Sequence, residues 1–466
     1  MTSIFDKELE LIKSSIKDIE RRQGEKKVNN PHVRQLIEIV EDFLRKKKLI
    51  CYGGTAINNV LPPKDQFYDK NVEIPDYDFF SKNAMKDAKE LADIYTRNGY
   101  DNVVASSGAH GGTFKVFVEF IPVADITLLD DDIYNKIHKE CIVKEGIYYC
   151  SPNYLRMSMY LELSRPDGDV SRWEKVYTRL VLLNKNYPVL PKGKTCKNVE
   201  IQRFFTTKSS IFNNKTLFLM IREILIDENV VFFGAMANSL YNSLLKKKKQ
   251  RIVKIPNIPD FDVLSKNPEH TAELVKSELD KMRVKNVSIR KYKTHSSKKD
   301  YIEDEVISPQ YEVLIGDETV LFIYKPLACH AYNEIMVNGR SVKIASIDTM
   351  LSFYLAFLFT NKDYYDSRRL MCMCEILLKI QFEHLKKNIQ FKSIFKRFDI
   401  PCYGYQKTLE DIKKEKVHLF TKYEKGSEAR EHFFMKYNPT TIKKPKKTKK
   451  KKSKSNRKKT RKLTFF

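Results

Sequence analysis

Three aspartates of this chain stand beside or within expected apolar strands, in a pattern that suits metal binding. Asp76 and Asp78 are separated by one residue in the stretch 74–80, and Asp125 follows the largely apolar run 117–124. On a strand, residues i and i+2 project from the same face, so the first two carboxylates lie side by side. Like charges in an apolar setting repel unless a cation relieves them. If the two strands are neighbours, the three carboxylates have the spacing that holds two Mg²⁺ ions roughly 3.5–4 Å apart.

A glycine-rich turn precedes these carboxylates. Gly53, Gly54 and Thr55 close an expected strand at 49–52 and open a helix. Backbone N–H groups at a helix N-terminus, together with a hydroxyl, can hold phosphate groups. A lone Asp-x-Asp is most often a solvated turn and a lone Gly-Gly a helix start. Their order along this chain, however, supplies the parts needed for phosphoryl transfer.

The order strand, Gly-Gly-Thr, helix, strand with Asp-x-Asp and strand with a third Asp resembles the signature of the DNA polymerase β-like nucleotidyltransferases. Within that superfamily, the segments 52–57, 75–81 and 123–126 are most similar to the poly(A) polymerase catalytic subunits of nucleocytoplasmic large DNA viruses. Two differences stand out. The usual Gly-Ser is Gly54-Thr55 here, and the interval before Asp76 is long, which we interpret as an inserted loop rich in Pro, Lys and Asp.

The resemblance implies a polynucleotide adenylyltransferase, an enzyme of mRNA processing that adds AMP from ATP to RNA 3′ ends. Asp76, Asp78 and Asp125 would be both the catalytic residues and the ligands of two Mg²⁺ or Mn²⁺ ions. The predicted nucleotide-binding residues are Gly53, Gly54, Thr55, Ser81, Asn153, Tyr154, Arg172 and Lys175. Asn153, Tyr154 and Arg172 on the helices after Asp125 are expected to select adenine, because the aspartates touch only phosphates and the 3′ hydroxyl. Arg172 and Lys175 are expected to meet the triphosphate. The implied partners are RNA, ATP, and a second copy or a viral processivity subunit, in the host cytoplasm at the viral factory and in the virion.

Composition bounds the class of protein. With 466 residues and 42% hydrophobic content, the chain is long enough for two or three cored domains. Its net charge of +26 favours a polyanionic partner. The eight cysteines are scattered and form no Cys-x-x-Cys pair, which predicts free thiols in a reduced cytoplasmic compartment and no structural zinc. No apolar run approaches a signal core or the roughly 20 residues of a membrane span, so we expect no membrane insertion.

The pattern of the first site returns later in the chain. Residues 258–267 match residues 74–83 at seven of ten positions, and 232–237 stand where 51–56 stood. Further on, the sequence 324–329 aligns with 120–125, which places Cys329 at the position of the third aspartate. Ala235-Met236 likewise replaces Gly54-Thr55. We interpret the second copy as a degenerate domain that keeps its core and has lost its chemistry, with a single metal on Asp260 and Asp262 as the alternative.

The C-terminal segment is strongly basic. Between residues 443 and 462 there are fourteen Lys or Arg and no acid, which predicts disorder and non-specific RNA binding through phosphate neutralisation. A nuclear-import-like signal or a solubilising role are the alternatives. The predicted RNA-binding residues are Lys446, Lys447, Lys449, Lys450, Lys451, Lys452, Arg457, Lys458 and Lys459.

Together these patterns predict an α/β (α+β) protein with two tandem nucleotidyltransferase domains, each a mixed sheet flanked by helices. The expected divisions are a helical arm at 1–30, a catalytic domain at 31–200, a degenerate domain at 201–440 and a disordered basic tail at 441–466. Three other functions fit the residues: a nucleotidyltransferase for a small molecule or protein, a CCA-adding or cyclic-dinucleotide-forming enzyme, or a non-catalytic RNA-binding subunit.

Overall fold

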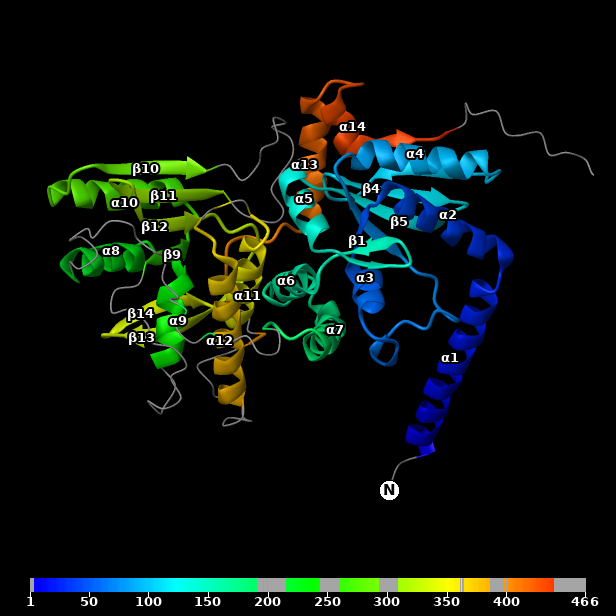
Figure 1. The fold of residues 1–466 in the computed structure, drawn as a ribbon, viewed down its shortest axis with the longest axis horizontal. Coiled ribbons are helices and arrows are strands. Elements are labelled where there is room, and N and C mark those ends of the chain that lie inside the picture. Colours follow the sequence, from blue (N-terminus) through cyan, green and yellow to red (C-terminus); the bar gives the residue numbers. More distant parts are fainter. Residues whose placement is uncertain are drawn as a thin grey trace, which may run out of the picture.

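Two mixed sheets, each flanked by helices, form the described part of the protein (Figure 1). The computed structural model describes residues 4–190, 196, 199, 215–243, 260–292, 309–360, 362, 364–385, 397–398 and 401–439. Within these residues each sheet has eight strands. The predicted fold class, two tandem α/β units, is therefore confirmed.

The first sheet carries the three aspartates near its centre. In order across the sheet, its strands are β16 (Lys436–Tyr437), β3 (Val103–Ser107), β4 (Thr113–Val118), β5 (Ile121–Leu128), β2 (Tyr77–Ser81), β1 (Ile50–Tyr52), β7 (Ile147–Tyr149) and β6 (Ile142–Lys144). The pairs β2–β5 and β1–β7 are parallel, and the other neighbours are antiparallel. Strand β16 comes from a late segment of the chain, although it pairs with the first sheet. The predicted domain boundaries remain a prediction.

The second sheet repeats this plan. Its strands, again in order across the sheet, are β10 (Val287–Tyr292), β11 (Gln310–Ile315), β12 (Glu318–Tyr324), β9 (Phe261–Leu264), β8 (Val231–Phe233), β14 (Arg340–Ala345), β13 (His330–Val337) and β15 (Cys402–Tyr403). Here β9–β12 and β8–β14 are the parallel pairs. Seven consecutive strands thus have the same order and directions in both sheets, as the repeated sequence pattern predicts.

The helices follow the same duplication. The helices of the first part are α1 (Ile4–Val28), α2 (Pro31–Lys47), α3 (Gly53–Val60), α4 (Ala84–Arg97), α5 (Asp131–Lys139), α6 (Pro152–Leu163) and α7 (Trp173–Asn186). The later ones are α8 (Lys215–Asp227), α9 (Gly234–Ser243), α10 (Pro268–Lys281), α11 (Ile347–Phe357), α12 (Ser367–Leu385), α13 (Leu409–Lys422) and α14 (Glu428–Phe434). Short 3₁₀ turns at Pro63–Asp65 and Val170–Arg172 lie in the inserted loop and before α7.

Helix α2 shows how local sequence fixes the elements. The Asn30 side chain accepts a hydrogen bond from the backbone N–H of His32 at 2.9 Å, and Pro31 occupies the first helical position. The helix ends at Lys48, which adopts the left-handed conformation. Its apolar residues recur at helical spacing and are buried: Val33, Leu36, Val40, Phe43 and Leu44. The helix therefore packs one face on the first core.

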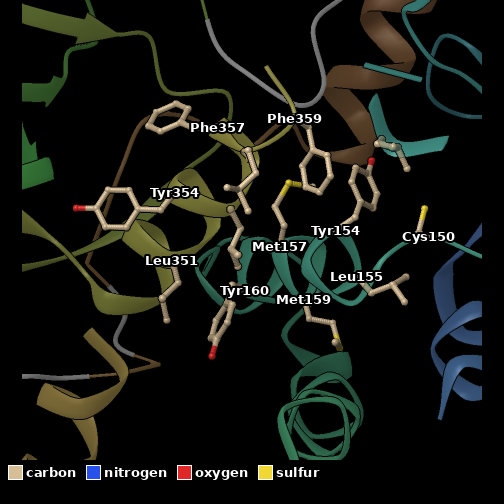
Figure 2. Close-up of a cluster of buried hydrophobic side chains, with 14 of the residues drawn as sticks. Cys150, Tyr154, Leu155, Met157, Met159, Tyr160, Leu351, Tyr354, Phe357 and Phe359 are labelled. Atoms are coloured by element: carbon tan, nitrogen blue, oxygen red, sulfur yellow. The ribbon is translucent and has the colours of Figure 1, made fainter. Parts of the chain in front are cut away.

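Corresponding helices of the two copies, α6 and α11, pack against each other. Figure 2 shows their buried side chains meeting, with Tyr154 and Met157 from α6 near Phe359 just after α11. The ring centroids of Tyr154 and Phe359 are 5.3 Å apart. This shared core fixes α6, and with it α7, relative to the second sheet.

Two further observations concern membranes and cysteines. No helix in the described part is long and apolar enough to cross a membrane.

The prediction of free thiols is wrong for half of the cysteines, because Cys196 is bonded to Cys372 and Cys329 to Cys402. The partners are 176 and 73 residues apart in sequence, so only the folded chain brings them together. The basic tail from 443 onward lies outside the described residues.

Candidate active site

The structure brings the three predicted aspartates together. Asp78 on β2 and Asp125 on β5 are directly paired in the parallel register of these neighbouring strands. Asp76 is exposed two residues before Asp78, where the strand pattern puts both side chains on one face. Strand register therefore sets the spacing of Asp78 and Asp125, whereas Asp76 directly precedes β2.

Burial and repulsion from neighbouring carboxylates disfavour the charged forms of Asp76 and Asp78. Loss of water contact raises the pKa of Asp78 to about 7, and the negative charges of Asp76 and Asp125 add to this effect. Desolvation and Asp125 also raise the pKa of Asp76. Positive charge from Lys115 and Arg172 acts in the opposite direction on Asp78. Added positive charge would therefore stabilise this cluster of carboxylates.

Lys115 already supplies part of that charge. It lies on β4 directly opposite Asp125, and its ammonium group donates a hydrogen bond to the Asp125 carboxylate. The lysine side chain is 40% exposed, so it is free to move toward solvent. Lys115 is a charged neighbour of the site that the motif pattern did not single out, because its place on β4 follows from the hairpin register alone.

The glycine turn lies against the carboxylates at the start of α3. Gly53 has φ +70°, and a Cβ at this residue would lie 2.4 Å from Oδ2 of Asp78. The N-cap residue of α3 is Tyr52, whose side chain makes no capping hydrogen bond to the helix. An anion beside Asp78 would thus meet the positive end of a helix.

The two predicted hydroxyl contacts have internal partners in this structure. Thr55 is buried and donates a hydrogen bond to the backbone carbonyl of Asp76 at 2.5 Å. Ser81 is also buried and donates to Asp87 at 2.5 Å, while accepting from the backbone N–H of Asn83. Thr55 therefore positions the backbone of one carboxylate, and Ser81 ties the end of β2 to α4. Their nucleotide-binding role stays a prediction.

Asn153 and Tyr154 lie at the start of α6. The amide oxygen of Asn153 accepts a hydrogen bond from Arg156 at 2.5 Å, and its nitrogen faces the sulfur of Met371 on α12 at 3.7 Å. Tyr154 is buried, with its ring 5.6 Å from that of Phe80. Phe80 shares a face of β2 with Asp78, so Tyr154 packs next to the carboxylates without reaching the surface beside them.

Helix α7 and the turn before it carry three basic residues that bear on the site prediction. Arg172 is exposed and forms an ion pair with Glu162 at 3.1 Å, yet its charge still lowers the pKa of Asp78. Lys175 is exposed. The structure adds a residue that sequence reasoning missed: Arg179, four residues after Lys175 and therefore on the same helix face.

Arg179 is the basic group placed directly at the glycine turn. It is only 9% exposed, and a Cβ added at Gly54 would lie 3.0 Å from its Nη1 atom. Its Nη2 atom donates to the Tyr68 hydroxyl at 2.7 Å, and its guanidinium lies 4.6 Å from the ring centroid of Phe67. Both aromatic residues belong to the inserted loop. A buried cation held by a phenol and ring faces suits an anionic ligand.

Comparison with known proteins agrees with this geometry. Residues 38–169 match the family model of the poly(A) polymerase catalytic subunit, and this segment includes the glycine turn and all three aspartates. This segment is therefore similar to that family. A putative poly(A) polymerase catalytic subunit of Acanthamoeba polyphaga mimivirus is 31% identical over 191 residues, which is 39% of this chain and 32% of the relative. One from African swine fever virus (strain Badajoz 1971 Vero-adapted) is 34% identical over 170 residues, 35% of each chain.

The chain thus spans about a third of the length of the curated members of the poly(A) polymerase family that it matches. A solved structure, the Megavirus polyadenylate synthase, extends the likeness of the fold. It superposes with a TM-score of 0.77 at 20% identity and covers 94% of this chain and 86% of its own. The family resemblance predicted from the sequence is therefore confirmed, and the fold of almost the whole chain has a solved counterpart.

The structure corrects one assignment in the second copy. In the sequence alignment, Cys329 replaces the third aspartate. In the fold, β12 is the counterpart of β5, and Asp262 pairs with Phe322 where Asp78 pairs with Asp125. Cys329 comes after β12 has ended. The alignment was wrong because it was anchored on a Pro-x-Ala match beyond the strand, whereas residues 320–323 of β12 are all apolar and offer no landmark.

Proposed function

We propose that this protein is a polynucleotide adenylyltransferase that extends RNA 3′ ends with AMP from ATP. The observation that carries the proposal is the meeting of Asp76, Asp78 and Asp125 beside the glycine turn. Carboxylates at one edge of this turn and a buried guanidinium at the other suit a substrate with a reactive phosphate and a charged leaving group. The family match over the same residues supports the choice of a nucleotide substrate.

The carboxylates fit a pair of hard divalent cations. The three aspartates offer only oxygen ligand atoms, which Mg²⁺ and Mn²⁺ prefer. Burial and the neighbouring carboxylates raise the pKa of Asp78, and a bound cation would offset both effects. Asp76 and Asp78 would hold both ions and Asp125 would complete the site. Bound there, the ions would favour deprotonation of the RNA 3′ hydroxyl and neutralise charge that develops on the phosphate.

The remaining groups would bind and position the triphosphate. Gly54 lacks a side chain where the backbone must approach phosphate oxygens, and the N-terminus of α3 offers N–H donors. Arg179 would contact the β- and γ-phosphates from the opposite side, with Arg172 and Lys175 as exposed basic groups further along the same helical segment. Tyr68 would hold the Arg179 side chain in place through the hydrogen bond of 2.7 Å. Catalysis by these residues is positioning and charge stabilisation.

Selection of adenine is assigned to the start of α6 and to the region before α7. Asn153, Tyr154 and Arg172 stay the proposed residues, because a specific base requires polar or aromatic groups near the sugar side of the phosphates. Tyr154 would act indirectly, through its packing, since its buried ring contacts Phe80. Substitution of Asn153 should narrow the preference for ATP without abolishing transfer.

One assay tests the proposal. The purified chain is incubated with a labelled RNA primer, Mg²⁺ and each nucleoside triphosphate in turn. We expect long extension with ATP and far less with CTP, GTP or UTP. Equal incorporation of UTP or CTP would exclude poly(A) synthesis and leave nucleotidyl transfer standing. RNA binding without any transfer would instead favour a non-catalytic RNA-binding subunit.

The basic tail and the partners form a separate part of the proposal. Residues 443–466 would hold RNA through phosphate contacts alone, so their deletion should weaken RNA binding and flatten its dependence on salt. Turnover at saturating primer should change little. A second copy or a viral processivity subunit, and a location in the viral factory and the virion, are inferred from the viral relatives.

A further inference from the structure

The two disulfides have different surroundings. Beside Cys329 and Cys402 lies the carboxylate of Asp167, and one ligand atom from each of these residues lies within 4.8 Å of the other two. The Cys402 sulfur is 3.4 Å from Oδ2 of Asp167. Within the described residues no comparable group of three contains Cys196 or Cys372. Among the described residues, the pair Cys329–Cys402 therefore has a third potential metal ligand beside it, and the pair Cys196–Cys372 does not.

Three elements hold these ligands in place. Asp167 lies in the turn that leads from α6 to α7, Cys329 directly precedes β13, and Cys402 starts β15. In the antiparallel pair β13–β15, Ala331 is opposite Cys402. The backbone N–H of Ala331 also donates to the carbonyl of Ser164 at the end of α6, at 2.8 Å. The group therefore joins the first copy to an edge of the second sheet.

We propose that Asp167, Cys329 and Cys402 bind a zinc-type divalent cation when the disulfide is reduced. In a tetrahedral zinc site, Zn–S bonds of about 2.3 Å and Zn–O bonds of about 2.1 Å place sulfur and oxygen roughly 3.5 Å apart. The sulfur-to-oxygen distance of 3.4 Å matches this value. Thiolates select zinc over magnesium, so this site would not compete with the three aspartates for Mg²⁺.

The exposure of the three residues fits an open site. Cys329 is buried, Cys402 is half-buried and Asp167 is exposed, so a water molecule can complete four ligands from the solvent side. His330 does not take that position, because adjacent strand residues point to opposite faces and its ring contacts Phe353. Strand β15 has two residues at the sheet edge, so Cys402 can shift as the sulfurs separate.

Loading requires a reductant and releases protons. A dithiol or phosphine supplies two electrons and, with two protons, converts the S–S bond into two thiols. The cation then replaces both thiol protons and binds the two thiolates and the carboxylate. The disulfide joins only Cys329, directly before β13, to Cys402 on β15. The bound metal would also hold the Asp167 turn. That turn leads into α7, which carries Arg179, so the metal would brace the proposed nucleotide helix.

The experiment uses the full chain in oxidised and phosphine-reduced forms. Each is titrated with Co²⁺ as a spectroscopic probe for zinc, and the sulfur-to-cobalt charge-transfer band is followed, since the aspartate cluster has no sulfur and cannot produce it. Bound Zn²⁺ is then counted after desalting. We expect one tightly held ion per reduced chain and none in the oxidised chain. Zn²⁺ should also raise the melting temperature of the reduced form.

Variants separate this site from general thiol binding. Cys402→Ser should abolish the charge-transfer band, and Asp167→Asn should weaken the binding of the metal at least tenfold. Cys372→Ser is the matched control, because it also breaks one disulfide and should bind metal like the parent. The proposal is overturned if the reduced parent shows no charge-transfer band, or if Cys372→Ser loses as much metal as Cys402→Ser. Circular dichroism of each variant confirms that folding is retained.

Discussion

The first and second sheets share a strand order but differ in the residues beside their central aspartates. In the first, Asp78 on β2 faces Asp125 on β5, and Lys115 on β4 comes next. In the second, Asp262 on β9 faces Phe322 on β12, and Glu312 on β11 comes next. The third carboxylate has been replaced by a phenyl ring, and the neighbouring cation by an acid.

The acid in the second sheet belongs to a closed hydrogen-bond network. Glu312 is only 1% exposed and accepts hydrogen bonds from Gln310 at 2.5 Å and from the Tyr364 hydroxyl at 3.0 Å. Its partners are internal, so the network stabilises the fold. The pocket beside Asp260 is lined by further side chains from α11 and α12, including Tyr354, Leu370 and Met373. Apolar and aromatic groups thus make up most of the pocket wall, together with Arg369.

The two positions of the glycine turn, 53 and 54, differ in how the second copy treats them. Gly53 and Gly234 both have positive φ, and a Cβ on either would lie within 2.4 Å of Oδ2 of the following aspartate, Asp78 or Asp262. Both copies keep this glycine. The next residue is Gly54 in the first copy and a buried Ala235 in the second. The first glycine therefore serves the fold, and the second allows the Tyr68 hydroxyl and the Arg179 guanidinium to approach the turn.

The largest expected difference between the copies is in the aspartates. Asp125→Asn should lower primer extension by at least about 1,000-fold, because it removes a charged metal ligand from the transition state. Asp262→Asn, the matched change in the second copy, should leave extension within about twofold. Initial rates at saturating ATP and primer measure both. Comparable losses in two folded variants would show that the second copy takes part in the chemistry.

A smaller effect is expected at the buried guanidinium. Arg179→Met should raise KM for ATP or lower kcat/KM by about 10–100-fold, since a hydrogen bond to a charged group contributes roughly 1.5–3 kcal/mol. Tyr68→Phe should cause a smaller loss, because it removes only the group that holds the arginine. Arg369→Met in the second pocket is the control and should leave KM unchanged. An Arg179→Met enzyme with normal ATP kinetics would remove this residue from the triphosphate site.

Sequence alone could predict the parts of this molecule that local patterns encode. The strand parity of Asp76 and Asp78, the cap at Asn30 and the repeated Asp-x-Asp segment all depend on near neighbours in the chain. The same strand order in both sheets confirms the predicted duplication. The meeting of Asp125 with the other two followed from one further assumption, that the two strands are adjacent.

The features that sequence missed depend on long-range packing. In the sequence, Arg179 is one more basic residue on a helix face. In the fold it packs against Phe67 and Tyr68, which lie more than a hundred residues earlier in the chain. Phe322 lies in a strand whose residues are almost all buried, and the polar residues Glu318 and Thr319 stand only at its start, away from the position opposite Asp262. The pairing of Cys329 with Cys402 likewise exists only after β15 joins the sheet.

The glycine comparison can be tested directly. Gly54→Ala should lower kcat/KM for ATP by about tenfold with little loss of stability, because the new Cβ would meet only the movable ends of Tyr68 and Arg179, at 2.6 and 3.0 Å. Gly53→Ala should instead destabilise the fold, since it forces a positive φ and a contact with Asp78. Gly234→Ala should destabilise the second copy in the same way without changing ATP affinity. Denaturant midpoints and ATP kinetics distinguish the three outcomes.

The smallest expected effect is a pH-dependent difference in stability between the parent and Asp78→Asn without metal. The pKa of Asp78 is about 7 in the folded chain, above its ordinary value of 3.8. Between these two values the folded state holds a proton that the unfolded state has released. Stability is therefore greatest below the lower pKa and falls as the pH rises to about 7.

Asparagine cannot ionise, so Asp78→Asn should escape this loss, and its advantage over the parent should grow from pH 5 to pH 8. Thermal melts in EDTA would show this as a gap of a few degrees that widens with pH. Subtracting the two curves cancels the other titrating groups. Mg²⁺ should then raise the melting temperature of the parent and not that of the variant, because the cation offsets the same repulsion that the substitution removes. Asp262→Asn should not abolish the Mg²⁺ response, and a parent whose stability is flat from pH 5 to pH 8 would contradict the proposed strain among the three carboxylates.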